Sequence, residues 1–210
     1  SQGKFDTISA DMWRKLSDAA GYKKTQWQVV ETTNYKLITQ LLINAKTHSE
    51  VYAFVSPAGS SKTKSVESFH RAYSDVYMLA CEEHWNKKEF LGTLYKSMGQ
   101  NPDGLKVSEL LNEIEKCAVA ALNPIIILDE LDKVRDELLY FFISLYNRIH
   151  GKCGVFLCST DYLKKRILKG IRTGRKGYAE FYSRIGGKFI EGVKPNAQDI
   201  AEICQQNGVT

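Results

Sequence analysis

Apolar residues follow two different periods along this chain. Five short runs rich in β-branched and aromatic residues predict strands; they cover residues 51–55, 75–81, 124–130, 154–160 and 188–193. Elsewhere apolar residues recur three and four positions apart, which predicts helices at 9–20, 33–46, 63–73, 87–98, 108–121, 131–149 and 162–169, and a last one in NAQDIAEICQQNGV. Buried strands that alternate with helices predict a parallel sheet covered by helices on both faces.

Several of these helices carry signals at their ends. Thr33 and Ser108 are the expected N-caps of their helices, and Gly151 lies just past the predicted end of the helix over 131–149. Glycines and cations dominate residues 170–187, where the apolar period is lost. This stretch predicts a basic loop or a short, interrupted helix.

A serine-rich loop follows the first predicted strand and leads directly into a helix. Its sequence, SPAGSSKTKS, is close to the phosphate-binding pattern G-x-x-x-x-G-K-[ST], with Lys62 and Thr63 in place and with Ser56 and Ser61 at the two glycine positions. A small-residue turn with an exposed lysine is the alternative, but the strand-loop-helix context favours a nucleotide site. The residues expected to line it are Ala58, Gly59, Ser60, Ser61, Lys62, Thr63 and Lys64.

Two adjacent acids end the strand in IIILDELDK. In a nucleotide site, Asp129 would help Thr63 to hold Mg²⁺, and Glu130 would act as the general base toward the attacking water. Adjacent acids are also common at helix starts, where they interact favourably with the helix dipole. The phosphate-binding loop favours the first interpretation, with ATP and Mg²⁺ as cofactors.

Two hydroxyl residues, Ser159 and Thr160, end the strand in GVFLCSTDYL. In a site of this class, a polar residue at such a strand tip orients the lytic water or contacts the γ-phosphate. A hydroxyl can equally cap the helix that follows. Both interpretations remain open at the level of the sequence.

Composition limits the possible classes. A chain of 210 residues with 43% apolar content can build one sizeable core. No apolar run is long enough to span a bilayer and residues 1–30 lack the apolar segment of a secretory signal, so we expect a cytoplasmic protein without a membrane partner. The five cysteines lack metal-ligand spacing and are interpreted as structural thiols. A net charge of +5 permits binding to a polyanion.

The motifs together resemble the AAA+ ATPases, and among them the transposition ATPases related to the phage Mu transposition protein B. The resemblance covers about residues 27–205 and rests on WQVVETTNYKLI, SPAGSSKTKS, IIILDELDK, GVFLCSTDYL and FYSRIGGKFIEGVKPNAQDI. It implies a P-loop NTPase sandwich of three layers, with a five-stranded parallel sheet in the order 5-1-4-3-2. It also implies an N-terminal helical extension (1–26), a nucleotide-binding domain (27–194) and the start of a truncated helical lid (195–210).

The resemblance further implies roles for individual residues. Thr160 or Ser159 would be sensor 1, and Arg184 would be the arginine finger that reaches the ATP of a neighbouring subunit. The backbone around Val30 and Thr32 would lie near the adenine. The usual glycines are absent from the loop, so a positive φ at Ser61 would cost about 1–2 kcal/mol relative to glycine.

Nucleic acid is the expected partner of two basic segments. Lys87 and Lys88 begin a helix, where backbone N–H groups can also meet phosphate. A denser basic run follows the strand at 154–160, and its candidate contacts are Lys164, Lys165, Arg172 and Arg175. The alternative for such runs is a solvated charged face.

The sequence thus predicts an ATP-dependent DNA-binding ATPase. It would form a homo-oligomeric ring or helical filament on duplex DNA without sequence specificity, and deliver target DNA to a transposase. The alternatives are a nucleotide-binding scaffold or signalling switch with little turnover, and a replication initiator or helicase loader. Fold alone does not separate these functions.

Overall fold

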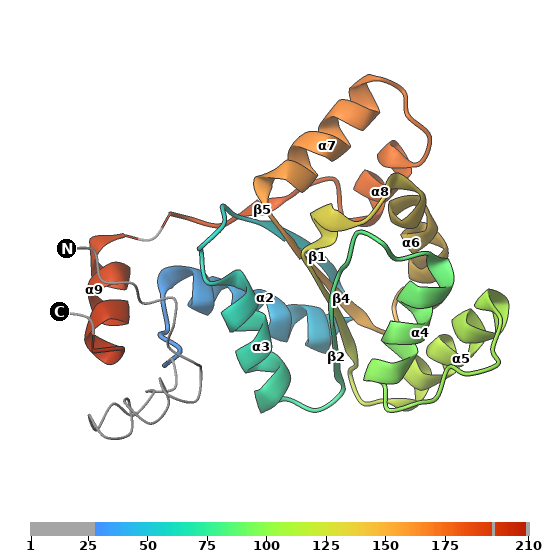
Figure 1. The fold of residues 1–210 in the computed structure, drawn as a ribbon, viewed down its shortest axis with the longest axis horizontal. Helices are drawn as coiled ribbons and strands as arrows, with labels where there is room; N and C mark the ends of the chain where they lie inside the picture. The colour runs from blue at the N-terminus through green and yellow to red at the C-terminus, as the bar shows by residue number, and fades with distance from the viewer. Residues whose placement is uncertain (1–27, 195, 209–210) are drawn as a thin grey trace, which may run out of the picture.

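The fold is known from a computed structural model that describes residues 28–194 and 196–208 (Figure 1). The predicted helix over 9–20 and the extension over 1–26 lie outside the described residues. The boundaries of the nucleotide-binding domain and lid therefore stay predictions.

A parallel sheet forms the centre of the molecule. Within the described residues it contains β1 (Val51–Val55), β2 (Val76–Ala80), β3 (Ile125–Asp129), β4 (Gly154–Ser159) and β5 (Ile190–Glu191). Their order is β2-β3-β4-β1-β5, and every pair is parallel. This is the predicted order 5-1-4-3-2 counted from the other edge. The central strands β3 and β4 are buried throughout, as continuous apolar runs require.

Helices cover both faces of the sheet (Figure 1). On one face α2 (Thr33–His48) and α3 (Lys62–Ala72) pack on alternate strand residues such as Phe54 and Ile127. The opposite face carries a larger apolar cluster from α4 (Lys87–Ser97), α5 (Val107–Ala120), α6 (Asp136–Ile149), α7 (Asp161–Arg172) and α8 (Tyr178–Arg184). These two apolar layers confirm the predicted three-layer sandwich.

The described chain ends in α9 (Ala197–Gln206), which is tied to the start of α2. The buried carboxylate of Asp199 accepts hydrogen bonds from the backbone N–H and the hydroxyl of Thr33, at 3.0 and 3.3 Å. Asn34 exchanges two hydrogen bonds with the backbone of Val193. No described helix is both long enough and apolar enough to cross a membrane.

The structure corrects the helix predicted over 131–149. A short 3₁₀ helix, η1 (Leu131–Lys133), comes first, Val134 is extended, and α6 begins only at Asp136. The break lies at Val134 and Arg135, and Arg166 Nη1 donates to the carbonyls of Asp132 and Val134 at 3.2 and 2.7 Å. The carboxylate of Asp132 is also bound by residues at the end of β4. Tertiary contacts therefore override the helical period here.

Smaller differences concern helix ends. The N-cap of α2 is Thr32 rather than Thr33, because its hydroxyl accepts the Tyr35 N–H at 3.2 Å. Ser108 lies inside α5, whose N-cap position is Lys106. The predicted strand over 188–193 shortens to β5. In the basic stretch over 170–187, α7 extends to Arg172. The short helix α8 follows, which agrees with the interrupted helix rather than with the basic loop.

Candidate nucleotide site

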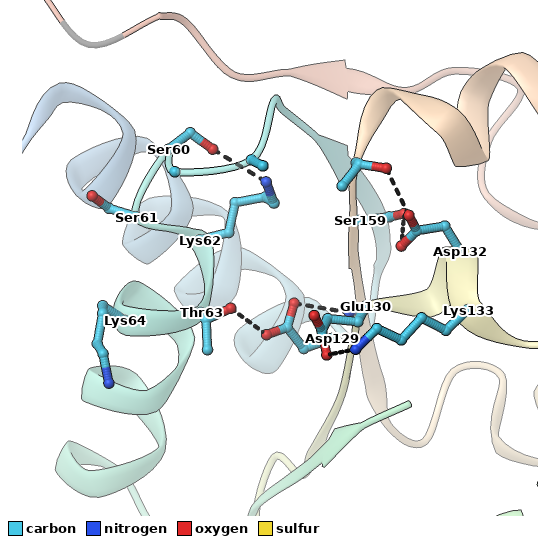
Figure 2. A pocket seen from close by; sticks show the side chains of 13 residues that line it. Ser60, Ser61, Lys62, Thr63, Lys64, Asp129, Glu130, Asp132, Lys133 and Ser159 are labelled. Carbon is cyan, nitrogen blue, oxygen red and sulfur yellow. Dashed lines mark hydrogen bonds and ion pairs between the residues drawn. The ribbon is translucent and has the colours of Figure 1, made fainter. Parts of the chain in front are cut away.

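The serine-rich loop joins the end of β1 to the start of α3. Ser61, at the second glycine position of the pattern, has φ 62° and ψ 9°, which is left-handed backbone. Such a conformation costs an L-residue roughly 1–2 kcal/mol relative to glycine. The Ser61 side chain makes no cap hydrogen bond and points away from Lys62 (Figure 2). The loop therefore has the turn that glycine normally provides, at the cost of local strain.

Ser56, at the first glycine position of the pattern, needs no left-handed backbone. Ser56 does not have a positive φ, is fully buried, and donates its N–H to the Ser159 carbonyl at 3.2 Å. Its hydroxyl fits because the adjoining residue is Gly192: a Cβ there would lie 2.7 Å from Ser56 Oγ and 2.6 Å from the ring of Phe54. The serine in the loop and the glycine after β5 are thus sterically coupled.

Lys62 places a buried cation inside the loop. Its Nζ donates to the carbonyls of Ser56 and Pro57 at 2.6 and 2.7 Å, and to the hydroxyl of Ser60 at 3.2 Å. The first turn of α3 carries no acidic residue, and no side chain caps it. A buried ammonium group beside uncapped helix N–H groups is a donor set that suits phosphate oxygens.

Thr63 and Asp129 meet across the loop. The Thr63 hydroxyl donates to Asp129 Oδ2 at 2.8 Å, and the Glu130 N–H donates to Asp129 Oδ1 at 2.9 Å. Burial raises the pKa of Asp129, while these hydrogen bonds act in the opposite direction. Among the described residues, no group of three or more His, Cys, Asp or Glu could hold a metal alone. A hydroxyl and one carboxylate suit Mg²⁺, which commonly completes its shell with water and substrate phosphates.

Glu130 lies next to this pair and faces a second lysine. Its carboxylate accepts a hydrogen bond from Lys133 Nζ at 2.6 Å (Figure 2). Both side chains are about half exposed. The hydrogen bond to Glu130 raises the pKa of Lys133, which therefore stays a cation. Like Ser61, Glu130 has left-handed backbone. Two of the strained residues of the chain thus lie at this site, which is where such strain tends to gather.

The hydroxyls at the end of β4 share one acceptor. Ser159 donates to Asp132 Oδ1 at 2.8 Å and Thr160 donates to Asp132 Oδ2 at 2.6 Å. Thr160 also accepts the Tyr162 N–H as the N-cap of α7. The capping interpretation thus holds for Thr160. The sensor role of the two residues stays a prediction.

These groups surround a cavity of about 490 Å³, within the usual size range of ligand sites. It is lined by Ala58, Gly59, Ser60, Ser61, Lys62, Thr63, Lys64, Asp129, Glu130, Asp132, Lys133, Ser159 and Thr160. Sequence reasoning missed Asp132 and Lys133. Both belong to the segment IIILDELDK. The sequence predicted an α-helix over 131–149, whereas residues 131–133 form a 3₁₀ helix, and Asp132 and Lys133 of this helix line the cavity.

Three predicted residues lie outside this lining. Val30 is buried, and Thr32 is engaged as the cap of α2. The guanidinium of Arg184 lies over the Tyr146 ring, with its carbon 5.9 Å from the ring centroid. Its Nη2 is 3.6 Å from Oε1 of Glu180. The adenine contacts and the trans-acting finger therefore stay predictions.

The candidate nucleic-acid contacts fall into two groups on separate elements. Three of them are paired within the chain: Lys87 with Glu137, Lys164 with Glu191, and Arg175 with Asp136. The other three, Lys88, Lys165 and Arg172, are exposed, and they take part in none of the ion pairs found among the described residues. Of the six candidates, these three therefore carry a positive charge that no ion pair among the described residues offsets.

Comparisons with solved structures agree with the fold. Cdc6p from Pyrobaculum aerophilum gives a TM-score of 0.65 at 14% identity, over 90% of this chain and 53% of that chain. A structure of Drosophila ORC bound to poly(dA/dT) DNA and Cdc6 gives 0.54 at 10% identity, over 98% and 37%. This chain thus spans about half or less of the proteins that it matches. At such identities the likeness shows the fold alone.

Sequence comparison is more specific about the family. No curated protein matches this chain significantly. A family model described as AAA domain matches residues 45–167, from the end of α2 through β4 into α7. The match includes the serine-rich loop, Asp129, Glu130, Ser159 and Thr160, and does not distinguish the type related to phage Mu transposition protein B. Because it covers more than half of the 210 residues, the chain belongs to the AAA domain family.

Proposed function

We propose that this chain binds ATP with Mg²⁺ in the cavity beside α3 and hydrolyses it. The hydrogen bond between Thr63 and Asp129 carries the proposal most directly. It brings a hydroxyl at the start of α3 and a buried carboxylate at the end of β3 together in the cavity that Lys62 also lines. Bound Mg²⁺ would be held there and would neutralise charge on the phosphates.

Different residues of the site would bind the phosphates, accept the proton and orient the attacking water. Lys62 and the N–H groups of the first turn of α3 bind the phosphates. Glu130 takes a proton as the water oxygen bonds to the γ-phosphorus and the bond from that phosphorus to the β–γ bridging oxygen breaks, which yields ADP and phosphate. The hydroxyls of Ser159 and Thr160 donate hydrogen bonds to Asp132, so their oxygens can accept a hydrogen bond from the water and orient it.

The proposal extends to duplex DNA and to assembly. The net charge of +5 supports contacts with the phosphate backbone, as do the candidates Lys88, Lys165 and Arg172, which take part in no ion pair within the described part of the chain. Among the described residues no arginine lines the cavity, which favours completion of the site by Arg184 of a neighbouring subunit. The full proposal is a homo-oligomeric ATPase that carries target DNA to a transposase, as the sequence motifs suggest.

A replication initiator is the second candidate. It is favoured by the likeness of the fold to Cdc6p and to an ORC structure that is bound to DNA. Selection from a pool of random duplexes, retained by the protein in the presence of ATP, separates the two. A target carrier should enrich no sequence, whereas an origin-specific initiator should enrich one.

The salt dependence of DNA binding tests the proposed contacts. Each phosphate contact contributes about −0.9 to the slope of log K against log salt. The double variant Lys165→Ala with Arg172→Ala should therefore flatten the slope by roughly two units, and Lys88→Ala by roughly one. Lys116→Ala is the control, because this exposed lysine on α5 pairs with Glu113. Slopes that all equal that of the wild type would remove DNA backbone contacts from these elements.

A further inference from the structure

Two lysines that line the cavity, Lys64 and Lys133, have no side-chain role in the proposed mechanism. Three lysines line this cavity in all: Lys62, Lys64 and Lys133. Lys62 is bound within the loop, and Lys64 pairs with Glu67 on the exposed side of α3. Lys133 comes instead from η1, on the other side of the cavity, and directs its Nζ toward Glu130 (Figure 2).

The position of Lys133 matters because it flanks the metal-binding pair. Its ammonium lies 2.6 Å from the carboxylate of Glu130, the residue that follows Asp129. The Lys133 side chain is 49% exposed, so it is not packed in place. An exposed ion pair of this kind contributes little to stability, about 0–1 kcal/mol. It can therefore be exchanged for a better partner at small cost.

A phosphate oxygen is such a partner. The terminal phosphate of a nucleoside triphosphate adds negative charge that a diphosphate lacks, and Mg²⁺ held by Thr63 and Asp129 would draw that charge to their side of the cavity. Lys133 lines the same cavity and contacts Glu130, the neighbour of Asp129, so it would gain a charge-assisted hydrogen bond only when the terminal phosphate is present. The same movement would release Glu130 from its ion pair and leave its carboxylate available to a water molecule.

Building on the proposed function, we infer that Lys133 is a cis-acting ligand of the terminal phosphate, which makes the site select triphosphate over diphosphate. The ion pair with Glu130 is its resting position. Coordination by a side chain of the same subunit predicts that this selectivity is present in an isolated monomer, independent of DNA and of any neighbouring arginine.

Equilibrium binding in a Glu130→Gln background tests the inference. Without that substitution, loss of Lys133 would also leave the Glu130 charge unpaired, and repulsion could weaken ATP binding indirectly. The Glu130→Gln protein removes this charge and slows hydrolysis, so that calorimetry with Mg²⁺ can measure the affinities for ATP and ADP. Adding Lys133→Met should weaken ATP binding roughly tenfold and ADP binding less than twofold.

Two further variants serve as controls. Lys133→Arg in the same background should keep most of the preference for ATP, since it retains a cation of similar reach. Lys116→Met should leave both affinities unchanged, because Lys116 lies on α5 outside the cavity lining and pairs with Glu113. An unchanged ratio of ATP to ADP affinity in Lys133→Met would overturn the inference while leaving the proposed function intact. If the folded Glu130→Gln parent binds neither nucleotide, the proposed function fails and the inference falls with it.

Discussion

Replacing Ser61 by glycine should stabilise the protein. Ser61 has φ 62° and ψ 9°, and its side chain makes no cap hydrogen bond. Removing the side chain therefore relieves strain of roughly 1–2 kcal/mol. Glycine also gives the unfolded chain more freedom, which offsets about 0.5–1 kcal/mol of this gain. We expect a net increase of about 0.5–1 kcal/mol in the free energy of unfolding.

Urea unfolding at equilibrium measures this change, and two control variants isolate its cause. Ser61→Ala keeps the strained backbone and should be close to neutral. Ser60→Gly makes the same chemical change one residue earlier, where φ is not positive and the hydroxyl donates to the Pro57 carbonyl at 2.8 Å, so it should destabilise. If Ser61→Gly lowers stability as much as Ser60→Gly does, backbone strain is not the controlling term.

Three other predictions concern binding, stability and assembly. Lys62→Ala should abolish ATP binding in calorimetry, because it removes the buried cation of the loop; an unchanged affinity would refute the phosphate-loop assignment. Burial opposes ionisation of Asp136, but hydrogen bonds, including those from Arg166, hold its pKa below the ordinary value. Because solvent screens this partly exposed carboxylate, Asp136→Asn should lose only about 0.5–1 kcal/mol near pH 7. That difference should shrink as pH falls below 4 through the folded pKa, whereas a difference independent of pH would exclude this charge effect. Arg184→Ala should bind ATP but hydrolyse it poorly, and mixing with Lys62→Ala subunits should restore turnover; co-assembled mixtures that stay inactive would remove the trans role.

The fold was predictable because its signals are local. The continuous apolar run before Asp129 predicts a buried strand, and the residues around Lys62 predict a phosphate-binding loop. Neither prediction needs information about tertiary contacts. The strand order was inferred from a resemblance that spans most of the chain, and it is confirmed. The strands and the loop are therefore local signals, whereas the strand order came from the resemblance.

The missing parts of the site depend on contacts between distant segments. The turn that presents Lys133 to the cavity depends on Asp132, whose carboxylate is held by hydroxyls at the end of β4. Ser56 is tolerated because residue 192 is glycine. The neutralisation of Lys87 requires Glu137 from α6. No periodic pattern contains such pairs, because each is created only when the strands and helices pack.

The central claim is that this cavity hydrolyses ATP with Mg²⁺, and phosphate release by the wild type and by Glu130→Gln tests it most directly. Both proteins would be measured with duplex DNA, in Mg²⁺ and again with the metal chelated. We predict turnover by the wild type that requires Mg²⁺, and loss of most of that turnover in Glu130→Gln while ATP binding persists. Equal turnover by the two proteins, or turnover that survives chelation, would contradict the account.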